Sequence, residues 1–185
     1  MRARNAASAE RTALKNRLAA AATGFLKGEL KRRIASLNTH IERLAAEIER
    51  RIKADPALAR RAEILASIPG IGPAVTADLL VDMAELGSLS AKAAASLAGL
   101  APIADDSGHR NGPRRIRGGR SQARRALYLA ALSAARYNPS LATFYKRLIE
   151  AGKKPKVAIV AVMRKLIVLA NTLLSDNRIW SPNRP

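Results

Sequence analysis

One segment constrains the fold of this 185-residue chain more than any other: residues 156–174 are apolar nearly all round a helix. Such a helix is buried either among other helices or in a membrane. Its two longest apolar runs, 157–163 and 166–170, are separated by Arg164 and Lys165, so we expect no membrane span. The segment is therefore predicted to be the central helix of a helical core.

Composition favours the same fold class. Apolar residues make up 48% of the chain but aromatic residues only 3%, which favours helices over a β-sandwich or barrel. Apolar periodicity and Gly or Pro breaks predict six further helices, at 29–53, 57–67, 73–83, 91–98, 121–138 and 141–151. The chain has no Cys and two isolated His, so disulfides, thiol catalysis and a dedicated metal site are not expected. We predict an all-α fold.

The helix predicted at 29–53 has apolar residues at alternating spacings of four and three, which is the seam of a coiled coil. These residues are Leu30, Ile34, Leu37, Ile41, Leu44 and Ile48. Two alternatives stay open: a dimerising arm that would make the protein a homo-oligomer, and a helix that packs on the body of its own chain. We predict a basic coiled-coil arm or linker at 1–56, a compact helical domain at 57–180 and a loose tail at 181–185.

Charge indicates the class of partner. The formal net charge is +19, from 33 Lys and Arg against 14 Asp and Glu. Residues 1–60 have 14 basic and 6 acidic side chains, residues 61–106 have 2 and 6, and residues 107–185 have 17 and 2. Because self-repulsion in a folded chain has to be offset, this excess implies a polyanion. Nucleic acid is the leading candidate, since cations that neutralise its phosphates release counterions; a merely solubilising surface is the alternative.

The sequence Ile-Pro-Gly-Ile-Gly-Pro at 68–73 lies between two predicted helices. Its glycines allow a tight hairpin, and Pro73 suits the first turn of the next helix. The arrangement resembles a helix-hairpin-helix motif, in which the hairpin amides bind a backbone phosphate without reading sequence. We predict DNA contacts from Gly70, Ile71 and Gly72, with an ordinary glycine-containing turn as the alternative.

Residues 102–120 have no apolar periodicity, which predicts a Gly- and Arg-rich loop or a short irregular hairpin about Ile116. The segment Ser107–Arg125 contains seven arginines whose guanidinium groups suit phosphate: Arg110, Arg114, Arg115, Arg117, Arg120, Arg124 and Arg125. Such cations would stabilise a phosphoryl centre attacked by the hydroxyl of Ser107, and Gly108 would let a DNA backbone approach closely. On spacing alone, a turn residue or a phosphate hydrogen-bond donor is the commoner role for such a serine.

Several segments together resemble one family, the C-terminal transposase domain of the insertion-sequence one-hundred-ten family. Its members include recombinases like the pilin-gene invertase and recombinases guided by a bridge RNA. The matching segments are IPGIGPAVTADLL, SLAGLAP, the Ser-Gly pair with the Arg-Gly run after it, RRALYLAALSAARYNP, FYKRL and GKKPKVAIVAVMRKLIVLAN. They occur in the family's order from about Leu58 to Trp180, and the basic helix before them resembles the family's linker.

The resemblance implies that Ser107 is a nucleophile that becomes covalently linked to DNA, with arginines of the same loop on phosphates. Family members also have an N-terminal RNase-H-like domain with four acidic residues and Mg²⁺. About 28 residues precede the predicted coiled coil, too few for that domain. We therefore expect no cofactor in this chain and DNA binding without cleavage, in the cytoplasm at the nucleoid; whether a guide RNA takes part stays open.

Two other functions remain as alternatives. The first is a stand-alone nucleic-acid-binding module without chemistry. The second is a coiled-coil oligomer whose basic C-terminal region is incidental.

Overall fold

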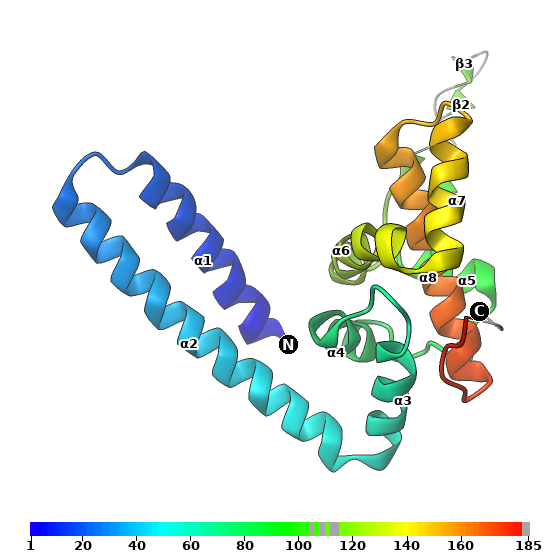
Figure 1. Ribbon diagram of the computed structural model, residues 1–185, viewed down its shortest axis with the longest axis horizontal. Coiled ribbons are helices and arrows are strands. Elements are labelled where there is room, and N and C mark those ends of the chain that lie inside the picture. Colours follow the sequence, from blue (N-terminus) through cyan, green and yellow to red (C-terminus); the bar gives the residue numbers. More distant parts are fainter. Residues whose placement is uncertain (104–105, 108–109, 112–114, 183–185) are drawn as a thin grey trace. The chain divides into compact units, whose positions relative to one another are not determined.

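The computed structural model describes residues 1–103, 106–107, 110–111 and 115–182, and these are mostly helical (Figure 1). The helices are α1 (Arg2–Ala20), α2 (Gly24–Ala54), α3 (Pro56–Ala66), α4 (Pro73–Asp82), α5 (Ala91–Leu97), α6 (Ser121–Tyr137), α7 (Pro139–Glu150) and α8 (Pro155–Ser175). Among the described residues between α5 and α6 there are four two-residue strands: β1 (Pro102–Ile103), β2 (Asp106–Ser107), β3 (Arg110–Asn111) and β4 (Arg115–Ile116). The predicted all-α fold class is confirmed. The chain forms two compact units, an N-terminal unit (Met1–Pro56) and a C-terminal unit (Ala57–Pro185).

The N-terminal unit is an antiparallel pair of helices, α1 and α2. Its buried cluster consists of Leu14, Ala21 and Leu30, with Leu18, Ile34 and Leu37 packed against it. The first half of the predicted seam on α2 therefore packs against α1 of the same chain. Ile41, Leu44 and Ile48, which continue the seam, are half-buried. Dimerisation through this arm stays a prediction.

Helix α1 lies in the predicted arm at 1–56, but before residue 29, where no helix was predicted. Few of its residues are large and apolar, so its periodicity is weak. Ala7, Leu14 and Ala21 are nevertheless buried at spacings of seven residues, which places them on one face. That spacing, together with the high helix propensity of the many alanines, is the signal that could have predicted the helix.

The C-terminal unit is built around α8, which packs against α5, α6 and α7. Ten of its residues are buried: Ala158, Ile159, Val162, Met163, Leu166, Ile167, Ala170, Asn171, Leu173 and Leu174. Within the described residues α8 is the one helix long and apolar enough to cross a membrane, with a mean hydropathy of 2.0 over 18 residues. Burial by the surrounding helices explains this apolarity, and the prediction of a central buried helix is confirmed.

A buried amide fixes the connection between α4 and α5 to the central helix. The Oδ1 atom of Asn171 accepts a hydrogen bond from the Gly87 amide at 2.9 Å, and its Nδ2 atom donates to the Leu89 carbonyl at 2.7 Å. With both ends of its side chain bonded, Asn171 avoids the free-energy cost of burying an unpaired polar group. This connection carries Glu85.

The turn between α3 and α4 packs against α6, the helix on which α4 also lies. Gly70 in this turn has φ +108°, and a Cβ atom there would lie 2.6 Å from the Cβ atom of Ala134 on α6. The position thus needs glycine both for its backbone conformation and for the close approach. Gly72, which precedes α4, has φ −87° and open space around it.

Gly70→Ala should therefore destabilise the C-terminal unit by about 3 kcal/mol, because it adds backbone strain and a steric clash. Gly72→Ala, two residues along the same turn, should cost less than about 1 kcal/mol. Urea denaturation followed by the fluorescence of Trp180, the single tryptophan, measures both. Its amide is hydrogen-bonded to Ser67 at 2.8 Å, so the probe lies close to the turn. Equal effects of the two substitutions would contradict the packing role of Gly70.

Candidate nucleic-acid interface

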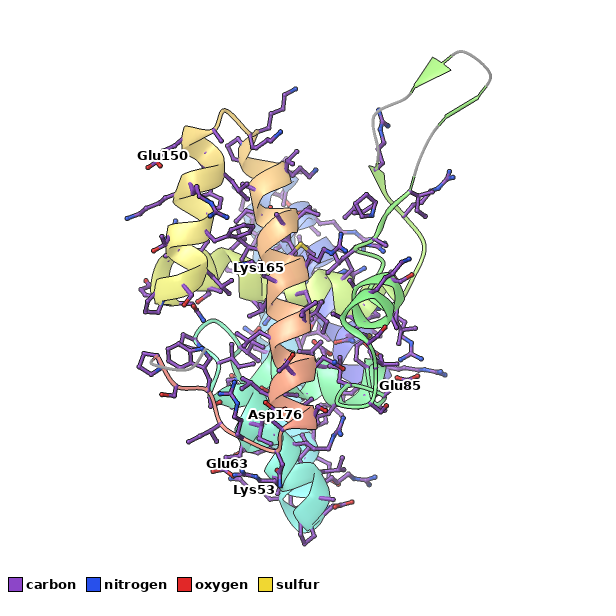
Figure 2. All side chains as sticks on the ribbon, turned by 90° about the vertical axis from the view of Figure 1, so that its right-hand side faces the viewer. Lys53, Glu63, Glu85, Glu150, Lys165 and Asp176 are labelled. Carbon is purple, nitrogen blue, oxygen red and sulfur yellow. The ribbon has the colours of Figure 1, made fainter. Side chains whose placement is uncertain are left out.

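The segment between α5 and α6 contains two short antiparallel ladders. Strand β1 pairs with β4, and β2 pairs with β3. A hairpin is therefore observed, but it is not centred on Ile116 as predicted, because Ile116 lies in β4 and pairs with Pro102 of β1. Ser107 is the last residue of β2 and is paired with Arg110 across the ladder. Figures 1 and 2 both show β2 and β3 beyond the helices of the C-terminal unit.

Some predicted site residues lie outside what the structure describes. Ser107 and Arg110 are described by their backbone alone, and Gly108 and Arg114 are outside the described residues. Their predicted contacts with DNA stay predictions. The described side chains of the predicted set belong to Arg115, Arg117, Arg120, Arg124 and Arg125.

The base of the hairpin is held by close backbone packing. The Arg120 amide donates a hydrogen bond to the Leu97 carbonyl at 2.8 Å. Gly99 has φ +69° and Gly119 has φ +60°, and a Cβ atom on either one would overlap the backbone of the other segment. These contacts fix the two ends of the loop to each other, where α5 ends and α6 begins.

Arg120 forms a two-point ion pair with Glu85. Its Nη1 and Nη2 atoms each donate to one carboxylate oxygen at 2.6 Å, and Nη1 also donates to the Asp82 carbonyl at 2.6 Å. The hydrogen bonds from Arg120 to the Glu85 carboxylate, together with one from the backbone amide of Glu85, lower the pKa of Glu85 to about 2. The pair fixes the start of α6 to the α4–α5 connection, which Asn171 holds on α8.

The predicted phosphate contacts thus fall into two groups. Arg120 is ion-paired and the Nη1 atom of Arg124 donates to the Gly118 carbonyl, so both have partners inside the protein. Arg115, Arg117 and Arg125 are exposed and form no ion pair with another described residue. A guanidinium group without an internal partner is available to an external phosphate, so these three are the described candidates for contact.

The α3–α4 turn lies on the same scaffold helix as the hairpin base. Ile71 is 4% exposed and its amide donates to the Ile68 carbonyl at 2.9 Å. Gly72 is exposed at the start of α4, where no side chain caps the first-turn amides. Ala134, which contacts Gly70, follows Arg124 on α6 by ten residues, or about 15 Å along the helix. The two predicted phosphate-binding segments therefore contact different ends of α6.

Metal ligands were not predicted in this chain. Within the described ranges, no three His, Asp or Glu side chains form a group that could hold a metal ion. The expectation that Mg²⁺ is bound by an acidic domain outside these residues stays a prediction.

Comparison with known proteins shows which proteins the chain, and above all its C-terminal unit, is similar to. Residues 62–146 match the family described as Transposase IS116/IS110/IS902. The pilin gene-inverting protein of Moraxella bovis is 38% identical over 144 residues, 75% of this chain and 44% of that protein. The IS900 42 kDa protein of Mycobacterium paratuberculosis is 35% identical over 161 residues, 83% of this chain and 38% of that protein. The IS110 43.6 kDa protein of Streptomyces coelicolor is 32% identical over 144 residues, 77% of this chain and 35% of that protein. The chain spans less than half the length of these relatives.

The Glu85–Arg120 pair predicts a specific pH dependence. Because folding lowers the pKa of Glu85 from 4.5 to about 2, the pair stabilises the fold above pH 4.5 and loses this effect as the pH falls towards 2. In Glu85→Gln this component is missing, so the stability of the variant should fall less over that range. At pH 7 the Arg120 amide of the variant should exchange its hydrogen faster.

Denaturation at a series of pH values and hydrogen exchange measure these two effects. Glu150→Gln is the control, since Glu150 forms no ion pair with another described residue. Identical pH profiles and exchange rates for wild type and Glu85→Gln would contradict an anchoring role for the pair.

Proposed function

This chain belongs, through residues 62–146, to the IS116/IS110/IS902 family of transposases, and we propose that it is the DNA-binding C-terminal part of an insertion-sequence transposase or site-specific recombinase. The observation that carries the proposal is the hairpin of β1 to β4. Its base is fixed to α5 and α6, it presents the backbone of Ser107 at the end of β2, and it is flanked by exposed arginines that form no ion pair with another described residue. Such a hairpin is suited to hold the phosphodiester backbone of a DNA strand next to the single hydroxyl group of Ser107.

In this function the hydroxyl oxygen of Ser107 attacks a backbone phosphorus. A serine–phosphate ester forms, the bond to one sugar oxygen breaks, the serine proton passes to a base, and the released sugar oxygen gains a proton. The ester keeps a phosphate linkage that a hydroxyl of another strand can attack in turn, which transfers the strand. Guanidinium groups stabilise the negative charge that builds up at phosphorus.

The family resemblance assigns the metal chemistry to an acidic domain that binds Mg²⁺, which would polarise the phosphate and help to activate the nucleophile. These 185 residues are expected to supply DNA binding and the serine, and to leave DNA uncut without that domain. The resemblance to a pilin gene-inverting protein supports recombination as the reaction class. A stand-alone binding module remains the second candidate. Arg120 and Arg124 already bond to groups of the protein itself, so they are less available to stabilise charge on a reacting phosphate.

Ser107→Ala separates these two candidates. The chain should bind a 30-bp duplex, and the substitution should change its dissociation constant less than about twofold, since neutral hydrogen bonds contribute little to phosphate affinity. Joined to the acidic domain of a relative, the wild-type chain should give a covalent protein–DNA adduct that survives denaturing electrophoresis, and Ser107→Ala should give none. Ser121→Ala, at the exposed start of α6, is the control and should keep the adduct. An adduct that persists in Ser107→Ala would exclude this serine, and no adduct from either protein would favour the binding module.

We also propose that the arm makes the protein a homo-oligomer. Ile41, Leu44 and Ile48 continue the apolar seam of α2, are half-buried, and lie outside the cluster that packs against α1. A second copy would bury this remaining stripe in the manner of a coiled coil.

Leu44→Lys should therefore shift the protein to the monomer in sedimentation-velocity experiments, because it places a charge in the seam. Ala45→Lys is the matched control, since Ala45 is the next residue along α2 and is exposed. A wild-type protein that is already monomeric at concentrations of about 100 μM, or an equal effect of both substitutions, would contradict the proposal. Far-UV circular dichroism shows whether the helices persist in each variant.

A further inference from the structure

A second basic surface lies outside the hairpin, on α7, α8 and the turn between them. Residues 139–175 contain seven Lys and Arg and one acidic residue, Glu150. All seven side chains are exposed, and none forms an ion pair with another described residue. They are Lys146, Arg147, Lys153, Lys154, Lys156, Arg164 and Lys165. We call them the α7–α8 basic surface.

One aromatic ring gathers cations from both helices. The Nζ atom of Lys165 lies 4.4 Å from the ring centroid of Phe144, and the guanidinium carbon of Arg147 lies 5.4 Å from it. Each cation is attracted by the ring, but the two repel each other. The fold therefore concentrates positive charge between α7 and α8, where neither cation forms an ion pair with another described residue, and an external anion would relieve the repulsion.

The geometry of this surface fits a polyanion rather than a single phosphate. Lys156 and Arg164 are eight residues apart on α8, which is about 12 Å along the helix and about 80° around it. Phosphates of one DNA strand follow each other every 3.4 Å along the duplex axis, so this distance corresponds to about three to four phosphates. Figures 1 and 2 both show the turn between α7 and α8 at the end of the C-terminal unit where β2 and β3 lie. Figure 2 labels Lys165 beside α8 and Glu150 at the end of α7.

We propose that the α7–α8 basic surface binds the phosphodiester backbone of the DNA that the hairpin contacts, as a second and independent contact. This inference rests on the proposed function, because it needs a nucleic acid at the hairpin. Five of the seven cations are lysines, which act on phosphate as flexible point charges. The surface therefore supplies affinity without reading sequence, while the anchored hairpin places the strand relative to Ser107.

The test compares three triple variants that each remove three positive charges. Lys153→Gln, Lys154→Gln and Lys156→Gln together neutralise the α7–α8 turn. Arg115→Gln, Arg117→Gln and Arg125→Gln together neutralise the exposed arginines of the hairpin and α6. The control combines Lys15→Gln, Lys27→Gln and Lys31→Gln, three exposed lysines of the N-terminal unit.

The measurement is the slope of log Kd against log salt concentration, by fluorescence anisotropy with a 30-bp DNA duplex and an RNA duplex of the same sequence. The α7–α8 and arginine variants should each lower the slope by about 3, and their combination by about 6, because each lost phosphate contact removes about 0.9. The control should keep the wild-type slope. Trp180 fluorescence during denaturation shows that each variant is folded. A lower slope with the DNA duplex supports the inference, and a lower slope with the RNA duplex alone would contradict it.

Three further results would overturn the inference, and they are distinguishable from failure of the proposed function. If the α7–α8 variant keeps the wild-type salt slope and the arginine variant has a lower one, the α7–α8 basic surface does not bind DNA and the proposed function still stands. An equal fall in the control shows that net charge alone matters. A combined loss no larger than that of either triple contradicts independent contacts. If the wild-type chain binds neither duplex, the proposed function fails as well.

Discussion

Burial of one broad apolar face of α8 is the constraint on which the C-terminal unit depends. A helix with apolar residues all round has to be covered by other helices, and α5, α6 and α7 cover it. Leu166 and Ile167 are fully buried, and each contributes about 1.5 to 3 kcal/mol through removal of apolar surface from water. The buried amide of Asn171 then ties the α4–α5 connection to the same helix. The hairpin is thus anchored to the core through Glu85 and Arg120.

Helix α6 is in contact with both segments that are candidates for nucleic-acid binding. Its first turn carries the hairpin base through Arg120 and Arg124, and Ala134 near its other end receives the backbone of Gly70. Both candidate contact segments are therefore fixed to one rigid helix, which sets their separation. A strand of nucleic acid that touches both would be oriented by the helix rather than by either loop alone.

The cations of this unit have different physical roles although the sequence presents them as one basic region. Arg120 satisfies a carboxylate and a carbonyl oxygen, and so fixes structure. The cations of the α7–α8 basic surface have no ion-pair partner among the described residues, and so favour an external polyanion. Unpaired exposed charge costs stability by self-repulsion, which the apolar core around α8 offsets. Binding of nucleic acid would remove that cost.

By itself the sequence determined most of the elements: the helices from α2 to α8, the central position of 155–175, the glycine-dependent turn before α4 and the basic Gly- and Arg-rich segment before α6. These features follow from periodicities of three and four residues and from Gly and Pro conformations, which are local properties of a chain. Only the tertiary structure decided which surfaces meet. The seam on α2 packs against α1 along its first half, α4 packs on α6, and Arg120 pairs with Glu85, 35 residues earlier. An apolar stripe or a guanidinium group fits many partners equally well, and the choice among them depends on how the whole core packs.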